Sequence, residues 1–353
     1  YNRKNNLLTY YTTYLTLLVS AWAGRHARVI RKSFYWILLI ALTIFVGFRN
    51  EVGCDWIAYE GHYSIGSEAA FLQSLNLRDP GHWLLISFLN YLGLPSYSLN
   101  VVASSLFFAG LHFLAKRQPD PLAFIVLCFP ILIINMPMSA IRQATAIGFM
   151  CLAFVAFIDR RQFLFIFWVF VGMLFHSSII VFLLLIPFVR MRFNLQNVIF
   201  GLIIFIPALI GMLQTESAEW ASNAYMKEGS AEAAGALFRL GILVLSGAYF
   251  LLKLAPYWRR NFPNDFKLVM IGSWMMVSFF LLFFVSSVIG DRFGYYLIPI
   301  QAMIFARIPY LSLGRFRQVH AAIPYIALTF VFIVWTMTSW HFSHCYTPYK
   351  FGF

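Results

Sequence analysis

The feature that most constrains this chain is a series of long apolar runs separated by short charged segments. A helix needs roughly 20 apolar residues to cross a bilayer. Runs of about this length cover residues 7–23, 33–48, 99–115, 121–136, 139–158, 194–213, 236–255, 267–288, 293–310 and 320–340. Because backbone polar groups cannot stay unpaired in lipid, such runs fold as helices. The sequence therefore predicts an all-α polytopic integral membrane protein.

The composition supports this class. Of 353 residues, 61% are hydrophobic and 11% are charged, against about a quarter charged in a soluble domain. The net charge of +13 follows from the positive-inside bias of membrane-protein loops. We therefore expect a single transmembrane domain over 1–353, without a soluble domain or a nucleic-acid partner. The run 7–23 has basic residues on both sides and no convincing cleavage site, so we interpret it as a span.

Loop charges set the orientation. The basic loop 24–33 is placed in the cytoplasm, which puts an acidic segment after residue 48 outside. The run 82–94 is too short to span, and we expect an interfacial or re-entrant helix on the outer face. The stretch 162–189 is expected to enter and return as two short helices with His176 at the tip. A single tilted span there is the alternative, and it would invert everything that follows.

This topology has about 12 transmembrane helices, some short or broken, and two outer loops, 49–98 and 214–235. Acidic residues provide a check that was not used to build it. Ten of the 13 acidic residues fall outside. The three that fall inside are Asp120, Asp159 and Asp265.

The four cysteines have no CxxC or metal-ligand spacing. Cys128 and Cys151 lie in apolar runs, where a free thiol behaves as a small hydrophobe. A disulfide between Cys54 and Cys345 is the less favoured alternative to free thiols. No group of His, Asp and Glu has a spacing that suits a metal ion, so no metal is predicted.

Polar clusters interrupt the apolar pattern where helices are predicted to end on the outer side. They are Arg49 to Tyr59, Asn135 to Gln143, His176-Ser177-Ser178 and Asp291-Arg292. Pro137 predicts a turn, with Arg142 and Gln143 in the first turns of the next helix. A charge in hydrocarbon costs about 3 kcal/mol on insertion scales. We therefore expect these side chains to meet in one outward-facing cavity.

The arginines of this cavity would suit a diphosphate. Arginine presents a rigid, always-charged fork of donors that matches phosphate oxygens. Arg49, Arg142 and Arg292 fall at the same predicted depth, and the commonest diphosphate at that surface is a polyprenyl diphosphate carrying a sugar. In the alternative, the arginines are snorkelling or ion-paired structural residues, with Asp291 beside Arg292 or Arg142 and Glu51 beside Arg49.

Two residues are candidate general bases. His176 could take a proton or donate to a phosphate, or it could be a satisfied structural group. Asp55 lies near Tyr59 and Trp56, and its carboxylate could act on a sugar hydroxyl. The aromatic rings could form a sugar platform, although for Trp56 an interfacial aromatic belt is favoured.

Five segments resemble, in order, the motifs of EpsG-type, Wzy-like polysaccharide polymerases. They are Arg49, Gly53, Asp55 and Tyr59 for R-x-x-x-G-x-D-x-x-x-Y; Asp79-Pro80-Gly81 for E-P-G; Arg142-Gln143 for R-Q; Phe175-His176-Ser177-Ser178 for F-H-x-S; and Asp291-Arg292 with Tyr295 and Tyr296 for D-R-x-x-Y. The likeness covers about residues 35 to 310. Asp79 departs from the family's Glu, and the motifs do not identify the sugar.

The resemblance implies polymerisation of undecaprenyl-diphosphate-linked repeat units into an O-antigen, capsule or exopolysaccharide. The reaction would take place at the outer face of the bacterial inner membrane, in a GT-C-like glycosyltransferase bundle without a cofactor or an obligatory metal. The growing glycan passes to an incoming lipid-linked repeat, and polyprenyl diphosphate leaves. A chain-length regulator and a flippase are the expected protein partners.

The resemblance also implies roles for individual residues. Arg142 and Arg292 come first as ligands of the diphosphate, with Arg49 next. His176 or Asp55 is the base. The remaining candidates for binding the diphosphate or the glycan are Gln143, Tyr59, Asp291 and Tyr295.

Three other functions compete. An O-antigen ligase, which moves glycan to lipid A core, would use the same lipid-linked donor and could bind its diphosphate with the same arginines. A large outer domain would favour a ligase. A transporter or flippase of an anionic lipid-linked glycan often shows inverted repeats, and none is found in the sequence. A membrane acyltransferase would depend on histidine and a cytoplasmic acyl donor, whereas His176 is predicted to face outward.

Overall fold

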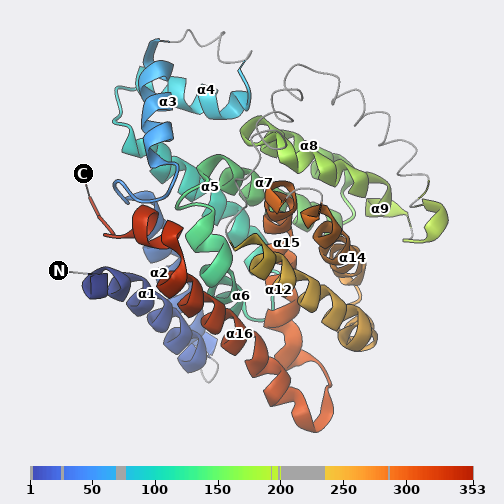
Figure 1. The fold of residues 1–353 in the computed structure, drawn as a ribbon. Coiled ribbons are helices and arrows are strands. Elements are labelled where there is room, and N and C mark those ends of the chain that lie inside the picture. Colours follow the sequence, from blue (N-terminus) through green and yellow to red (C-terminus); the bar gives the residue numbers. More distant parts are fainter. Residues whose placement is uncertain are drawn as a thin grey trace.

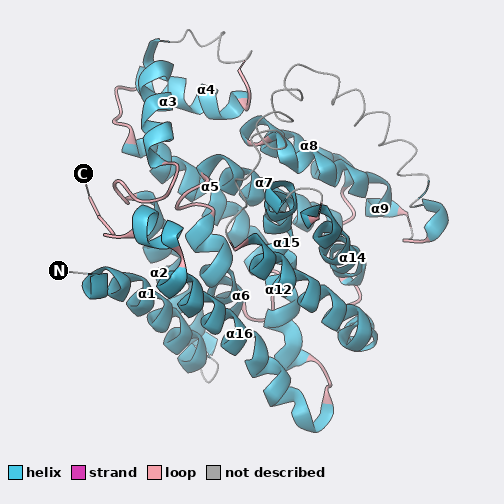
Figure 2. Ribbon diagram, viewed as in Figure 1, coloured by secondary structure: helices cyan, strands magenta, loops and turns pink. Residues whose placement is uncertain are grey.

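The protein is described here by a computed structural model covering residues 3–24, 28–68, 77–191, 193–197, 199, 235–284 and 287–352. Within these ranges the regular structure is helical, as predicted (Figures 1 and 2). One isolated antiparallel bridge joins Arg49 to Phe351. The description of an all-α protein with several long apolar helices is therefore confirmed.

The helices follow the apolar runs. The first part of the chain forms α1 (Arg3–Gly24), α2 (Arg28–Gly47), α3 (Trp56–Glu68), α4 (Pro80–Tyr91), α5 (Tyr97–Ala115), α6 (Pro121–Cys128), its π-helical continuation η2 (Phe129–Ile133), α7 (Ile141–Ile158), α8 (Gln162–Phe175), η3 (Ser177–Leu185) and α9 (Ile186–Arg190). The second part forms α12 (Ala236–Tyr249), η5 (Phe250–Leu254), α13 (Ala255–Asn261), α14 (Phe266–Phe283), α15 (Ser287–Arg307), η6 (Ile308–Tyr310), η7 (Gly314–Phe316), α16 (Arg317–Thr338) and η8 (Phe342–Tyr346).

Several of these helices can cross a membrane by length and composition. Within the described residues they are Tyr97–Ala115, Ile141–Ile158, Ala236–Asn261 and Gly314–Thr338. Shorter apolar helices accompany them, among them Pro121–Ile133 and Phe266–Leu281. The predicted span 194–213 and outer loop 214–235 lie almost wholly outside the described residues. The total of about 12 spans therefore stays a prediction.

Helix α7 lies at the centre of the bundle, between α5 and α8. It crosses α5 so closely that a Cβ added at Gly110 would lie 2.0 Å from the Gly148 carbonyl oxygen. Small residues permit this approach in membrane proteins, where packing replaces the hydrophobic effect between helices. The position of the α7 N-terminus is consequently fixed by backbone packing along the helix.

The stretch 162–189 turns back on itself, as the topology required. Helix α8 ends at Phe175, and η3 returns along it. The return is confirmed by Lys267, whose Nζ lies 5.5 Å from the centre of the Phe157 ring and donates to the carbonyl oxygens of Val189 and Met191 at 3.1 Å. Both ends of the hairpin therefore lie on one side of the bundle, and the alternative of a single tilted span is wrong.

The three acidic residues predicted inside gather with the basic loops. Arg117 pairs with Asp159 at 2.7 Å, and Arg31 approaches Asp120 at 3.8 Å. Buried Arg307 pairs with Asp265. Its Nε donates to Gln118 at 2.8 Å and its Nη2 to the Arg117 carbonyl at 3.3 Å. These contacts form a connected network, called the inner network below.

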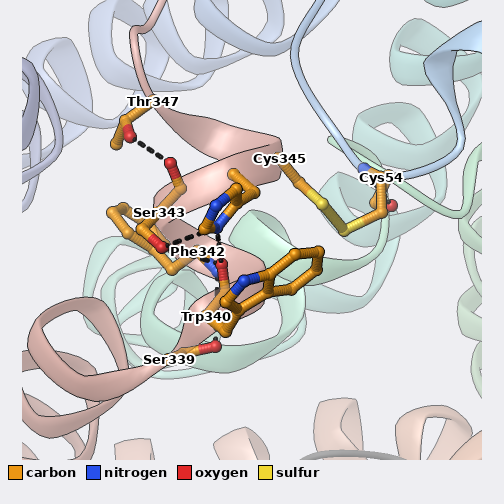
Figure 3. Close-up of a disulfide and its surroundings, with 9 residues drawn as sticks. Cys54, Ser339, Trp340, Phe342, Ser343, Cys345 and Thr347 are labelled. Atoms are coloured by element: carbon orange, nitrogen blue, oxygen red, sulfur yellow. Dashed lines mark hydrogen bonds between the residues drawn. A yellow bond between two sulfur atoms is a disulfide. The ribbon is translucent and has the colours of Figure 1, made fainter.

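The C-terminal tail corrects the prediction about cysteines. Cys54 and Cys345 form a disulfide across 291 residues of sequence (Figure 3). The tail after α16 folds over the loop that follows α2, where the Gly53 amide donates to the Cys345 carbonyl at 2.7 Å and the Asn50 amide to Lys350 at 3.0 Å. Sequence spacing could not reveal this pairing because it depends on how the C-terminal tail packs on the loop after α2.

Candidate functional site

A cavity of about 310 Å³ lies at the end of the bundle opposite the inner network. Its lining residues are His62, Leu77, Arg78, Asp79, Trp83, Arg142, His176 and Arg292. Arg292 is close to the start of α15, whereas Arg307 ends that helix. The 15 residues between them correspond to about 22 Å of helix. The cavity, called the arginine cavity below, is thus at the end predicted to face outward.

The Pro137 turn places Arg142 at this cavity. Turn residues 136–139 end the preceding helix, and α7 begins at Ile141, as the sequence predicted. The Nη1 of Arg142 donates to the Asp79 Oδ2 at 2.9 Å. The Arg142 side chain keeps 31% of its surface exposed, whereas the Asp79 side chain keeps 2%. The guanidinium is therefore both anchored and accessible.

Asp79 joins three elements at the cavity. It adopts the left-handed conformation, with φ of 58°, directly before Pro80 starts α4; aspartate tolerates this region better than most residues. Its Oδ1 accepts from the Ser177 amide at 3.2 Å. A Cβ at Gly81 would lie 2.8 Å from the Cβ of Leu174 on α8. The glycine thus lets α4 approach α8 and bring Asp79 to Arg142.

His176 stands at the hairpin tip between α8 and η3. Its Nδ1 lies 2.7 Å from the Ser178 hydroxyl, which lies 3.0 Å from the Tyr296 hydroxyl. Burial lowers the pKa of His176 well below its usual range, and the charges of Arg292, Arg142 and Arg78 add to this. The imidazole is therefore neutral at pH 7, with one nitrogen that can accept and one that can donate. The Nδ1 accepts from the Ser178 amide at 3.4 Å.

Gln143 joins α7 to α15 rather than facing the cavity. Its Nε2 donates to the Arg292 carbonyl at 2.6 Å, and the residue is buried. The amide therefore fixes the backbone next to Arg292, whose side chain lines the cavity. Gln143 is not among the residues that line the cavity, and its role as a direct ligand stays a prediction.

Asp55 and Tyr59, at the start of α3, are not among the residues that line the arginine cavity, but the charge of Arg142 acts on both. A Cβ at Gly53, which has φ of 104°, would lie 1.9 Å from the Met138 carbonyl oxygen, so only glycine fits this turn. Desolvation raises the pKa of Asp55, and the charges of Arg142 and Arg292 oppose the rise. Burial raises the pKa of Tyr59, whereas the charge of Arg142 and a hydrogen bond from it act in the opposite direction.

Arg49 is occupied by backbone oxygens. Its Nε donates to the carbonyls of Val52 at 3.2 Å and Met138 at 2.9 Å, and its Nη1 to Val46 at 2.6 Å. Its Nη2 reaches Asn100 Oδ1 at 3.2 Å. The fork therefore holds the loop after α2 against the Pro137 turn and does not line the arginine cavity. The alternative partner Glu51 pairs instead with Lys350.

Asp291 and Tyr295 lie on another face of α15. Arg239 of α12 donates from Nε and Nη2 to the two Asp291 oxygens at 2.8 and 2.7 Å. The same guanidinium carbon lies 5.5 Å from the centre of the Tyr295 ring. Asp291 thus pairs with neither Arg292 nor Arg142. Arg239 could not be assigned a role from the sequence, because the residues around it do not indicate a partner in another helix.

Sequence reasoning also missed a cluster of rings around the arginine cavity. The His62 ring lies 5.6 Å from His82 and 4.9 Å from Trp83, and His82 lies 5.6 Å from Tyr59. Burial and the charge of Arg142 lower the pKa of both histidines, so they are neutral. One sequence signal was available, the segment Asp79-Pro80-Gly81, which resembles a family motif but does not reveal its place in the site.

The arrangement can hold an anion next to a neutral base. Arg78, Arg142 and Arg292 surround the cavity with one buried carboxylate, Asp79. Guanidinium donors in a partly dry site bind phosphate oxygens strongly and stabilise negative charge that develops on them. In the described residues no group of three or more His, Cys, Asp and Glu has the arrangement to hold a metal ion.

Comparison with known proteins gives one family. The model of the EpsG family matches residues 32–351, which is most of the chain. No curated protein and no solved structure matches.

Proposed function

Since the chain belongs to the EpsG family, a membrane polysaccharide-biosynthesis family, we propose that it is a polysaccharide polymerase. In this proposal it acts as a glycosyltransferase on undecaprenyl-diphosphate-linked repeat units, at the outer face of the bacterial inner membrane. The observation that carries the proposal is the convergence of Arg142, Arg292 and Arg78 on one cavity beside neutral His176.

The cavity suits the leaving group of this reaction. The bond between the anomeric carbon of the growing glycan and the diphosphate oxygen breaks, and its electron pair leaves with polyprenyl diphosphate. Arg142 and Arg292 would stabilise the charge that develops there. Because Asp79 already fixes Arg142, little reorganisation is needed when the anion forms.

The attacking group is a hydroxyl of the incoming lipid-linked repeat. Its oxygen forms the new bond to the anomeric carbon, and its proton passes to a base. His176 lines the cavity as a neutral imidazole, and Asp55 lies at the N-terminus of α3 within the field of both arginines. Both groups therefore stay candidates for this proton.

The disulfide supports the proposed orientation. Disulfides persist in oxidising compartments such as the bacterial periplasm and are rare in the cytosol. Cys54 directly precedes Asp55, so the disulfide lies at the same end as the arginine cavity. The inner network, with the basic loops, lies at the opposite end, in agreement with the positive-inside bias.

The test is complementation of a strain that lacks its own polymerase, with glycan chain length followed on gels. The informative variant combines Arg142→Gln with Asp79→Asn, because removing both charges together avoids leaving a buried carboxylate alone. We expect the ladder to collapse to a single repeat, while exposed Arg315→Ala keeps it. Membrane levels are compared by blotting.

Other outcomes separate the competing functions. A ladder that is complete but never reaches lipid A core in the deletion strain would favour a ligase. Accumulation of repeat units on the cytoplasmic leaflet would favour a flippase. A normal ladder with the double variant at normal levels would contradict the proposed role of the arginine cavity.

A further inference from the structure

A second, chemically different pocket lies on the other side of Tyr59. It measures about 230 Å³ and is formed by the loop after α2, the first turns of α3 and the start of α5. The side chains that matter for its chemistry are Trp56, Tyr59, Glu60, Ser96, Tyr97 and Asn100. We infer that this pocket, called the α3–α5 pocket, binds an uncharged sugar ring of the glycan.

The pocket is built for hydroxyl groups rather than for phosphate. Arg49 lines it, but the Arg49 fork is taken up by the carbonyls of Val46, Val52 and Met138 and by Asn100. Carboxylates line it as well, and Glu60 accepts from the Ser96 hydroxyl at 3.1 Å. The Arg49 donors are thus already engaged, and the Glu60 carboxylate offers acceptors to neutral hydroxyl groups.

Aromatic rings supply the apolar part of the surface. Trp56 and Tyr97 are half-buried, so part of each ring remains open to the pocket, and Tyr59 is buried at its inner wall. Flat amphipathic rings beside hydrogen-bonding groups are suited to ligands that combine C–H faces with hydroxyls. The volume is below the roughly 300–1,000 Å³ that buries a whole drug-sized ligand, so the pocket suits one sugar unit.

Tyr59 links this pocket to the arginine cavity. It lines the α3–α5 pocket and is hydrogen-bonded to Arg142. Asp55 directly precedes Trp56 at the start of α3, and Arg142 and Arg292 act on its charge. A glycan whose diphosphate lies at Arg142 would therefore reach the pocket past Tyr59. The inference rests on the proposed function and adds the place where the sugar is recognised.

Binding measurements on the protein in nanodiscs test the pocket. The probes are the free repeat-unit oligosaccharide, released by mild acid from the strain's own lipid-linked repeats, and undecaprenyl diphosphate without sugar. We expect Trp56→Ala and Glu60→Gln to weaken oligosaccharide binding at least about tenfold, equal to about 1.4 kcal/mol. The affinity for undecaprenyl diphosphate should stay within about twofold of the wild type, because an aromatic residue contributes binding energy only for the part of the ligand that it contacts.

Two controls make the result specific. Trp274→Ala removes a half-exposed tryptophan on α14, far along the chain from the pocket, and should bind both probes as the wild type does. The double variant Arg142→Gln with Asp79→Asn should show the reverse pattern, with undecaprenyl diphosphate binding lost and oligosaccharide binding kept. If Trp56→Ala unfolds the protein, Glu60→Gln decides, because it changes only a charge at the surface.

The pocket inference is overturned if Glu60→Gln and folded Trp56→Ala bind the oligosaccharide normally. It is also overturned if the wild type ignores millimolar oligosaccharide while it binds undecaprenyl diphosphate, and the proposed function then survives. If the wild type binds neither undecaprenyl diphosphate nor the intact lipid-linked repeat, the proposed function fails, and the pocket inference fails with it.

Discussion

Two arginines of this protein, Arg307 and Arg142, are each paired with one aspartate at opposite ends of the bundle. Arg307 at the inner end pairs with Asp265 and is almost fully buried, with 3% of its side chain exposed. Its other donors reach Gln118 and a carbonyl, and its guanidinium lies 5.2 Å from the centre of the Trp258 ring. All the space around this cation is filled by protein.

Arg142 at the opposite end has the same kind of partner and a different environment. Asp79 binds one nitrogen, and 31% of the side chain remains exposed beside the arginine cavity. An ion pair alone thus does not distinguish these two arginines. The space in front of the cation does. Arg49 lines the α3–α5 pocket, but it resembles Arg307 in that oxygen acceptors already occupy its donors.

The largest expected effect is at Arg307, which is surrounded by protein. Arg307→Ala leaves the Asp265 carboxylate buried without its partner, and we expect a loss of about 3–5 kcal/mol in the free energy of unfolding. Thermal melting in detergent and the amount of protein in membranes measure this loss. Exposed Arg315→Ala is the matched control. Normal melting of Arg307→Ala would show that the inner network is not structural.

The next largest effect is expected at Arg142, which lines the arginine cavity. Arg142→Lys keeps a positive charge near Asp79 but loses the planar fork, so melting should change little. We expect polymerisation to fall by at least about tenfold, because a point charge replaces a bidentate donor at the leaving group. Rates are measured with purified lipid-linked repeats. Equal activity of Arg142→Lys and the wild type would mean that only charge matters at this position.

Gly81→Ala tests whether the close contact between α4 and α8 positions the residues of the arginine cavity. The added Cβ would lie 2.8 Å from the Leu174 Cβ and 3.0 Å from its carbonyl oxygen, so α4 must move away from α8. Asp79 would move with it, and misplacement by about 1 Å can cost up to about 100-fold in rate. Gly61→Ala, which meets nothing within 4 Å, is the matched control. Polymerisation rates should fall for Gly81→Ala alone.

The smallest effect is in the pH dependence. Burial and the nearby arginines lower the pKa of His176 well below its usual value of 6.5. If His176 takes the proton, its active neutral form is fully populated above pH 6.5, and activity falls only in more acid solution as the imidazole becomes protonated. Initial rates between pH 5 and 8, with His176→Gln for comparison, measure this. A decline beginning above pH 7 would exclude His176 as the base.

Much of the fold could be predicted from the sequence, because the lengths of the apolar runs and the charges of the loops follow from the properties of the bilayer. The helix break at His176 followed from the loop charges and the turn at Pro137 from the local effect of proline, and the structure has both. The partners of charged side chains did not follow, because Asp291 meets Arg239 across two helices. The Cys54–Cys345 disulfide was disfavoured for the same reason, since it joins distant ends of the chain.

The site was only partly predictable. Arg142, His176 and Arg292 could be brought together because each lies where a helix meets the outer side. Asp79, His62 and Trp83 were missed because α3 and α4 are short, and the packing of α4 on α8 depends on Gly81 rather than on any periodic pattern. The role of Arg49 could not be inferred, because the sequence does not show whether carbonyl oxygens of the protein already accept from the donors of an arginine.

The most direct test is single-turnover release of undecaprenyl diphosphate by the purified protein given purified lipid-linked repeats. The wild type is compared with the double variant Arg142→Gln and Asp79→Asn at equal thermal stability. We expect release to be coupled to formation of a two-repeat product in the wild type, and to be at least about 100-fold slower in the variant. Release at the wild-type rate by a folded double variant would contradict the assignment of the arginine cavity as the site of polymerisation.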